Sequence, residues 1–207
     1  MNVLGLGAHP DDIELMAGGT IAKWKSEGHN VHVLRFTDGV WTAPGGELMR
    51  EKAAALAEER AAAKVLGYSV ENLEYQALAL EFKDQMVVDT LKRIQELKID
   101  TIICPWERDS NHDHEIVARI AFAASRKVSR VLMGQINYYL REVFAPNIFV
   151  DISNTFDQKI QSLECYESQW SRQGTDWHEF LDVTSRYYGK MIGVKRAEGF
   201  VTPKFLL

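Results

Sequence analysis

Apolar residues follow two different rhythms in the first two thirds of the chain. Short continuous apolar runs, typical of strands buried on both faces, lie at 2–7, 31–36 and 101–104. Apolar residues three to four positions apart, which predict amphipathic helices, lie at 13–24, 86–97 and 116–124. A helix is also predicted at 47–64, with Leu66-Gly67 as its stop, and a strand near 73–78. This alternation predicts an α/β fold: a Rossmann-like, three-layer arrangement with a mostly parallel sheet.

The last third of the chain departs from this alternation. Two further strands are predicted at 135–140 and 147–152, one helix face at 156–170 and another helix at 177–192. No internal repeat, low-complexity tract or linker interrupts the sequence. We therefore expect a single domain over 1–207, with a small cap formed by the C-terminal segment.

The composition argues against several classes of protein. The 207 residues carry 29 acidic and 24 basic side chains, and this net charge of −5 argues against a general binder of nucleic-acid backbones. The two cysteines, Cys104 and Cys165, form neither a disulfide framework nor a Cys-x-x-Cys metal site. The sequence shows no signal segment and no apolar run of about 20 residues. We expect a cytoplasmic protein with neither a nucleic acid nor a membrane as its partner.

Two loops at the ends of predicted strands are rich in side chains that bind metals. They follow the strands at 2–7 and 101–104, at the sheet edge where α/β proteins bind ligands. Together they contain His9, Asp11, Asp12, Asp109, Asn111, His112, Asp113 and His114. Two histidines and an aspartate form a ligand set that Zn²⁺ accepts, and three protein ligands leave room for substrate. A second interpretation stays open, because Asp12 and Asp113 are also typical N-caps of helices.

The glycines of the first strand do not predict a dinucleotide cofactor. Gly5-x-Gly7-x-x-Pro10 begins like the dinucleotide-binding fingerprint, but proline replaces the third glycine, which allows close packing of helix on strand. The chain also contains neither a Gly-x-x-x-x-Gly-Lys-Ser/Thr loop nor a Gly-x-Ser-x-Gly nucleophile elbow. The chemistry predicted by the sequence is therefore that of the two metal-ligand loops.

Both loops resemble motifs of a known enzyme family. Residues 7–14, Gly-Ala-His-Pro-Asp-Asp-Ile-Glu, are similar to the AHPDD[IV]E signature of the LmbE-like, PIG-L-type N-deacetylases. Residues 109–114, Asp-Ser-Asn-His-Asp-His, resemble the family's second motif, Asp-x-His-x-Asp-His. Further similarities at 37–39, 66–67 and 146–153 extend the resemblance over nearly the whole chain.

The resemblance implies a role for each matching residue. His9, Asp12 and His114 match the metal ligands, and Asp11 matches the carboxylate that acts as general base on the attacking water. Asp113 matches a carboxylate that orients a ligand and tunes its basicity. Zn²⁺ is the expected metal, and two histidines with an aspartate would also accept Fe²⁺ or Co²⁺.

The sequence departs from the family pattern at two positions. Asn111 replaces a histidine that is often assigned as the electrophile or general acid; asparagine can donate a hydrogen bond to an oxyanion but cannot supply a proton. Either His112, if turned inward, or a protonated Asp11 could deliver the proton instead. The family's arginine contact to substrate reads Ala55 here, and Arg50 is the candidate replacement.

The expected reaction is removal of the N-acetyl group from an N-acetylglucosamine-type amino sugar or its conjugate, a small-molecule substrate. Asp11, Asp113 and Asn111 are the expected catalytic residues. Four tryptophans are candidates for a sugar-stacking wall, with Trp106 the best of them because its loop leads to His114; the others are Trp41, Trp170 and Trp177. Two alternatives stay open: hydrolysis of another N-acyl amide, such as an amine or thiol conjugate, and sugar binding without catalysis. The sequence also leaves open whether the chain forms a homo-oligomer.

Overall fold

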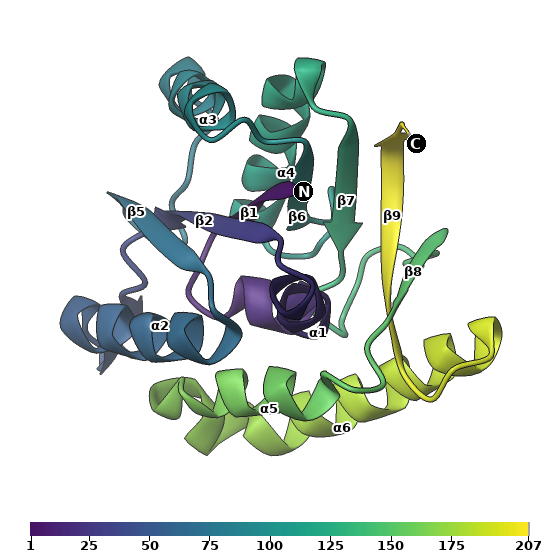
Figure 1. The fold of residues 1–207 in the computed structure, drawn as a ribbon. Helices are drawn as coiled ribbons and strands as arrows, with labels where there is room; N and C mark the ends of the chain where they lie inside the picture. The colour runs from purple at the N-terminus through teal and green to yellow at the C-terminus, as the bar shows by residue number, and fades with distance from the viewer. Residues whose placement is uncertain (207) are drawn as a thin grey trace.

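A seven-stranded sheet runs through the centre of the protein and carries helices on both faces (Figure 1). The computed structural model describes residues 1–206, and its sheet has the strand order β5-β2-β1-β6-β7-β9-β8. These strands are β1 (Asn2–Gly7), β2 (Asn30–Thr37), β5 (Ser69–Tyr75), β6 (Thr101–Pro105), β7 (Arg130–Gly134), β8 (Ile148–Asp151) and β9 (Ala197–Phe205). The first five strands in the order pair in parallel, whereas β9 runs antiparallel to both β7 and β8. The predicted α/β fold with a mostly parallel sheet is confirmed.

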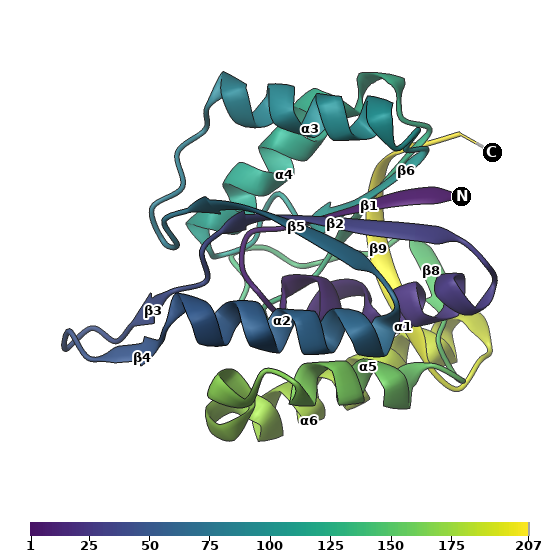
Figure 2. The same ribbon diagram turned by 60° about the vertical axis from the view of Figure 1, so that its left-hand side comes forward.

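The helices form layers above and below this sheet (Figures 1 and 2). They are α1 (Asp12–Ser26), α2 (Lys52–Leu66), α3 (Asp84–Glu96), α4 (His112–Ala124), α5 (Phe156–Glu164) and α6 (Glu167–Ile192), with a short 3₁₀ turn, η1 (Ser125–Lys127). Helices α3 and α4 cover one face, and α1 and α2 cover the other. Helix α5 lies outside α1 and α2, and α6 packs along α5 and against β9. None of the helices described within 1–206 combines the length and apolar character needed to span a bilayer.

The central strands are apolar because both of their faces are covered. On β1, Leu4 and Leu6 belong to the core shared with α4, while Val3 belongs to the core shared with α1. This strand alternation explains why the sequence there is a continuous apolar run rather than an alternating one.

Helix α1 is held in place by contacts with the C-terminal part of the chain. A Cβ at Gly19 would lie 2.9 Å from the Ile152 side chain, so only glycine permits this close approach. The buried Glu198 carboxylate of β9 accepts hydrogen bonds from the backbone amides of Gly19 and Thr20. Lys159 of α5 pairs with Glu198 and donates to the Leu15 carbonyl oxygen. These contacts fix the helix whose first turn contributes to the candidate site.

Two predicted boundaries in the first two thirds are wrong. The helix predicted from 47 begins at Lys52, because the preceding residues form a hairpin of β3 (Trp41–Thr42) and β4 (Leu48–Arg50). Gly46 takes a φ of 88° in that hairpin, a conformation that glycine adopts freely. The strand expected near 73–78 is β5, which ends at Tyr75.

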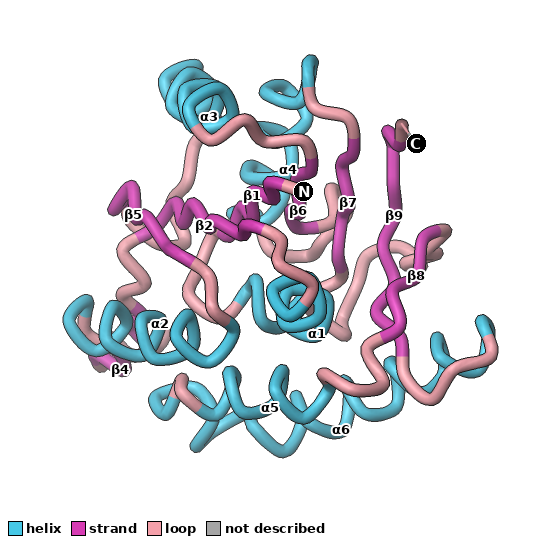
Figure 3. Tube along the Cα trace, viewed as in Figure 1, coloured by secondary structure: helices cyan, strands magenta, loops and turns pink. Residues whose placement is uncertain are grey.

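The last third differs more strongly from its prediction. Residues 135–140 form a loop after β7 rather than a strand, and the helix face at 156–170 is divided between α5 and α6 (Figure 3). Strand β9 is an element that the sequence pattern does not predict, since Glu198, Pro203 and Lys204 interrupt its apolar residues. Pro203 is tolerated because it lies beyond Phe200, where the pairing with β8 ends, and in the irregular stretch between Val201 and Lys204 of the pairing with β7. The C-terminal segment therefore extends the sheet with two strands and adds the outer helices, rather than forming a small cap.

The buried Lys159–Glu198 pair should contribute much more to stability than an exposed pair. Replacing Lys159 with Met leaves a buried carboxylate without its counter-charge, and we expect a loss of about 3 kcal/mol in the free energy of unfolding. Lys52→Met is the matched control, because Lys52 and Glu74 form an exposed pair worth about 0.5 kcal/mol. Urea denaturation measures both values, and equal losses would contradict the anchoring role of the buried pair.

Candidate metal centre and active site

The two loops predicted to carry the chemistry lie side by side at the carboxyl ends of β1 and β6. These strands are neighbours in the sheet, with Val3 paired to Thr101 and Gly5 to Ile103. From β1 the chain proceeds through β2 to β5 on one side, then returns to continue with β6 and β7 on the other. The site therefore lies at the point where the strand order reverses, which is where open α/β sheets form their binding crevice.

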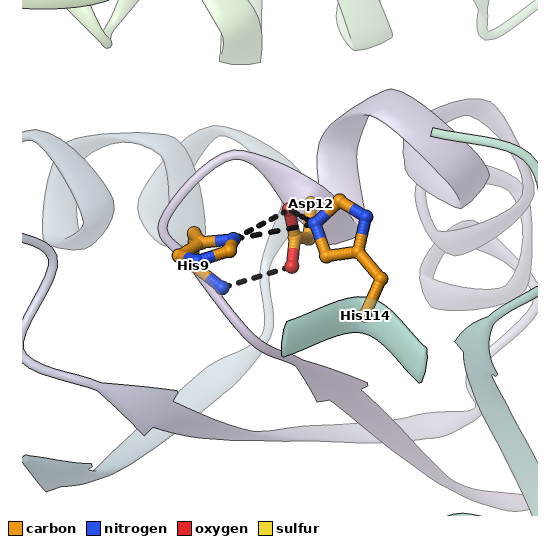
Figure 4. A group of neighbouring side chains, drawn as sticks. All are labelled: His9, Asp12 and His114. Carbon is orange, nitrogen blue, oxygen red and sulfur yellow. Dashed lines mark hydrogen bonds and ion pairs between the residues drawn. The ribbon is translucent and has the colours of Figure 1, made fainter. Parts of the chain in front are cut away.

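His9, Asp12 and His114 bring three metal-binding atoms together (Figure 4). His9 Nδ1 lies 3.2 Å from His114 Nε2, and His114 Nε2 lies 3.1 Å from Asp12 Oδ1. We refer to these three atoms as the donor triangle. Its third side, from His9 Nδ1 to Asp12 Oδ1, measures 3.8 Å. Zinc–ligand bonds of about 2.0–2.1 Å in a tetrahedron put neighbouring ligand atoms roughly 3.4 Å apart. The donor triangle therefore fits a divalent ion of this kind without rearrangement of the backbone.

The Asp12 carboxylate is fixed by the loop that precedes it. Its Oδ2 atom accepts hydrogen bonds from the backbone amides of Ala8, at 2.7 Å, and His9, at 2.8 Å. Asp12 is the first residue of α1, but its side chain bonds to these upstream amides rather than capping the helix. Its other oxygen, Oδ1, remains directed at the two imidazoles. This arrangement favours the ligand interpretation of Asp12 over the N-cap interpretation.

Each imidazole is oriented by a second carboxylate on its far side. His9 Nε2 lies 3.0 Å from Asp113 Oδ2, and His114 Nδ1 lies 3.1 Å from Asp109 Oδ1. Asp113 in turn accepts hydrogen bonds from the backbone amides of Leu78 and Leu80. Carboxylates in this position fix the ring orientation of a metal-binding histidine and raise its basicity.

The electrostatics of the donor triangle favour positive charge. Burial lowers the pKa of His114, but the carboxylates of Asp12 and Asp109 outweigh burial and raise that pKa to about 10. Burial opposes a charged imidazole at His9 too, yet hydrogen bonds with Asp113 and Asp12 raise its pKa above the usual value. Burial raises the pKa of Asp12, but the opposing effect of the two imidazoles is larger and brings that pKa below the usual range. A divalent ion would supply the positive charge that protons supply otherwise.

Asp11 lies beside the donor triangle, but its carboxylate is not one of the three donor groups. The residue adopts a φ of 89°, and its side chain makes no hydrogen bond that caps α1. Its Oδ2 atom is 3.7 Å from Arg50 Nη1, and Arg50 is held by a hydrogen bond from its Nε to the Gly39 carbonyl oxygen. Burial raises the pKa of Asp11 to about 7, against the opposing effect of Arg50. A carboxyl group with a pKa near neutrality is suited to exchanging protons.

A cavity of about 170 Å³ opens over these residues. Its lining combines the site residues with side chains from the β3–β4 hairpin, the loop after β7 and helix α6: His9, Asp11, Asp12, Arg50, Trp41, Asn111, His114, Asn137, Tyr139, Gln169, Gln173 and Trp177 among them. The site is therefore assembled from both ends of the chain.

Asn111 and Asp113, both at the start of α4, occupy different positions relative to this cavity. Asn111 lines it, and its Oδ1 atom accepts a hydrogen bond from the Asp113 amide, as an N-cap does. Asp113 is buried behind His9 and is absent from the lining. His112 makes its contact with the Leu80 carbonyl oxygen, at 2.9 Å from Nε2, and does not line the cavity.

The expectation that Trp106 forms a sugar-facing wall is wrong. Trp106 is buried in the core, where its ring packs edge-on against Phe144. Trp41 and Trp177 line the cavity instead. Both are among the four tryptophans that the sequence offers as candidates. The sequence does not favour them over Trp106, because Trp41 is in an unpredicted hairpin and Trp177 is distant along the chain. The sequence identifies Asp109 only as one acidic residue of its loop. Its contact with His114 Nδ1 is seen only in the structure.

The comparisons with known proteins agree with this geometry. Residues 4–125 match the family model described as PIG-L: GlcNAc-PI de-N-acetylase. Diacetylchitobiose deacetylase from Thermococcus kodakarensis is 28% identical over 225 residues, which cover 99% of this chain and 84% of the relative.

Two solved structures are similar over essentially the whole chain. The conserved protein TT1542 from Thermus thermophilus has a TM-score of 0.85 and 28% identity, covering 100% of this chain and 96% of its own. N,N'-diacetylchitobiose deacetylase from Pyrococcus horikoshii has a TM-score of 0.83 and 24% identity, covering 98% of this chain and 84% of its own. At that identity, the second likeness supports the fold alone.

Metal affinity should fall as the pH falls. The pKa of His114, raised to about 10, means that the metal-free site holds a proton at neutral pH, and an ion must displace it. We expect the association constant to increase about tenfold per pH unit for each displaced proton, up to roughly pH 10 for His114. Chelator competition with Zn²⁺ between pH 6 and 9 measures this slope.

Two histidine variants control that measurement. His114→Gln should abolish tight binding, whereas His112→Gln should retain both the affinity and its slope, because His112 bonds to a backbone carbonyl. A wild-type affinity that does not change over this pH range would contradict the assignment of the donor triangle.

Proposed function

The chain belongs to the PIG-L family of de-N-acetylases, and from this membership we propose that it is a zinc-dependent hydrolase of N-acetylglucosamine-type amino sugars or their conjugates. The observation that carries the proposal is the uncommitted Asp11 carboxylate beside the donor triangle. A donor triangle alone would suit a structural metal site, whereas an adjacent carboxyl group that lines the cavity suits a hydrolytic one.

The side chains divide the reaction between them. A zinc ion held by His9, Asp12 and His114 would supply a Lewis acid that polarises the amide carbonyl and acidifies water. Asp11 takes a proton from the attacking water as the new carbon–oxygen bond forms. The same carboxyl group then returns that proton to the amide nitrogen as the carbon–nitrogen bond breaks, so that acetate and the free amine leave.

Asn111 stabilises the negative charge that develops on the carbonyl oxygen. Its Oδ1 atom is engaged by the Asp113 amide, so its Nδ2 group is the part left to donate a hydrogen bond. An oxyanion donor of this type contributes a factor of about 10²–10³ to turnover. His112 bonds to the Leu80 carbonyl oxygen, which favours Asp11 over His112 as the source of the final proton.

The lining of the cavity supports an amino sugar as the substrate. Trp41 and Trp177 contribute aromatic surface to the cavity, although the Arg172 guanidinium stacks on the Trp41 ring. Asn137, Gln169 and Gln173 provide donors and acceptors for hydroxyl groups. Arg50 also lines the cavity and lies near Ala55: a Cβ at Gly39 would be 2.9 Å from the Ala55 Cβ, and the Gly39 oxygen binds Arg50. Arg50 is thus the proposed replacement for the family's arginine contact to substrate.

Acetate release from N-acetylglucosamine derivatives tests the reaction and its dependence on metal. We expect release by the purified protein, its loss after chelation and its recovery with added Zn²⁺. A panel that includes N-acyl amines and thiol conjugates identifies the acyl substrate. Release from those amides alone would contradict the sugar assignment, and no release from any member by the zinc-loaded protein would contradict the hydrolase.

Asp11→Asn tests the role of the general base. The variant cannot take up the proton of the attacking water, and we expect kcat to fall by about 10²–10⁴ with the metal content unchanged. Asp176→Asn, at an exposed position on α6, is the control and should retain full activity. Near-normal turnover by metal-loaded Asp11→Asn would assign the base to another residue.

A further inference from the structure

The mouth of the cavity has an apolar edge that the reaction itself does not use. Leu78 and Tyr139 line the cavity, and each is 60% exposed. The Tyr139 ring packs against Tyr138, with centroids 5.3 Å apart, and Tyr138 packs against Phe180 of α6, with centroids 5.7 Å apart. We refer to Leu78, Tyr138, Tyr139 and Phe180 as the apolar rim. It connects the cavity to the surface of α6.

Leu78 occupies its place at a conformational cost. Its φ is +62°, in the left-handed region that residues other than glycine, asparagine and aspartate avoid. Two backbone contacts hold it there: its amide donates to Asp113 at 2.6 Å, and two residues later the Leu80 amide donates to the same carboxylate. The carboxylate that orients His9 thus also fixes the backbone of the apolar rim.

The backbone contacts of residue 78 do not require a leucine side chain. The hydrogen bond to Asp113 uses only the backbone, and glycine or asparagine would adopt the same φ with less strain. The leucine side chain is mostly exposed, so it gains little by burial in the core. An unfavourable backbone conformation that presents an apolar side chain at the mouth of a site indicates a ligand contact.

The size of the cavity indicates what part of a ligand would reach the rim. Its volume of about 170 Å³ is below the roughly 300–1,000 Å³ typical of pockets that enclose a whole drug-sized molecule. It therefore encloses a group about the size of one sugar ring. Any substituent on that ring must leave the cavity through the mouth, where Leu78 and Tyr139 meet it.

We propose that the apolar rim is a subsite for an alkyl or aryl aglycone of the amino-sugar substrate, with Leu78 and Tyr139 as the residues that determine this preference. The inference rests on the proposed function for the identity of the ring in the cavity. It adds to that function the chemical class of the group attached to the ring. The occupant is the substrate itself, because the same two side chains line both the cavity and its exposed edge.

Binding of sugars that cannot be deacetylated tests the rim separately from the reaction. Isothermal titration of the zinc-loaded protein with hexyl β-D-glucoside and with D-glucose compares the same ring with and without an apolar aglycone. We expect hexyl glucoside to bind at least tenfold more tightly, since the alkyl chain covers Leu78 and Tyr139. Equal affinities, or no binding of either sugar, would overturn the proposal.

Leu78→Asn is the informative variant, because asparagine tolerates a positive φ. We expect the preference for hexyl glucoside to fall roughly five- to tenfold while the melting temperature stays the same or rises. A residue with a merely structural role would lower stability instead. Leu48→Asn, at an exposed leucine of β4 that does not line the cavity, is the matched control and should retain the preference.

The outcomes separate this inference from the proposed function. A Leu78-dependent preference in a protein that deacetylates no N-acetylglucosaminide would support the rim and contradict the reaction. Deacetylation of N-acetylglucosamine with the same preference in wild type and Leu78→Asn would support the reaction and overturn the rim. If Leu78→Asn changes the oligomeric state in size-exclusion chromatography and not the preference, the rim is a contact between copies of the chain, and the proposal is wrong.

Discussion

The Asp12 carboxylate is the interaction on which the site depends. One of its oxygens is held by the backbone amides of Ala8 and His9, and the other faces the imidazoles of His9 and His114. A buried carboxylate is stable only when its charge is compensated, and here two amides and two imidazoles compensate it. The turn after β1, the left-handed conformation of Asp11 and the start of α1 accompany this arrangement. The same turn leaves the Asp11 carboxylate outside the donor triangle and inside the cavity.

The N-terminal part of the chain provides the reactive groups, and the C-terminal part provides much of the surface around them. Parallel pairing of β1 with β6 brings the two motif loops together at the reversal of strand order. Helix α6 then adds Gln169, Gln173 and Trp177 to the cavity, and the loop after β7 adds Asn137 and Tyr139. The Lys159–Glu198 pair links these two parts through α1. Under the proposed function, chemistry and specificity are contributed by different segments of one fold.

The sequence predicted the parts of the structure that local chemistry determines. The apolar runs of β1, β2 and β6 and the proximity of His9, Asp12 and His114 follow from burial and parallel pairing. The β3–β4 hairpin, strand β9 and the wall formed by Trp41 and Trp177 depend on contacts between distant segments, which leave no period in the sequence. Arg50 illustrates the difference: the sequence makes it a candidate for a missing substrate contact, but only the fold shows that it lies near Asp11. The positive φ of Leu78 is likewise determined by Asp113, 35 residues away along the chain.

The central claim is that His9, Asp12 and His114 hold one catalytic divalent ion beside Asp11. Anomalous diffraction at the zinc absorption edge, from crystals grown with Zn²⁺, tests this claim most directly. We expect a single strong peak about 2.0–2.2 Å from His9 Nδ1, Asp12 Oδ1 and His114 Nε2, with the Asp11 carboxylate beside it. A peak that excludes any of these three atoms, or the absence of a peak at the site, would contradict it.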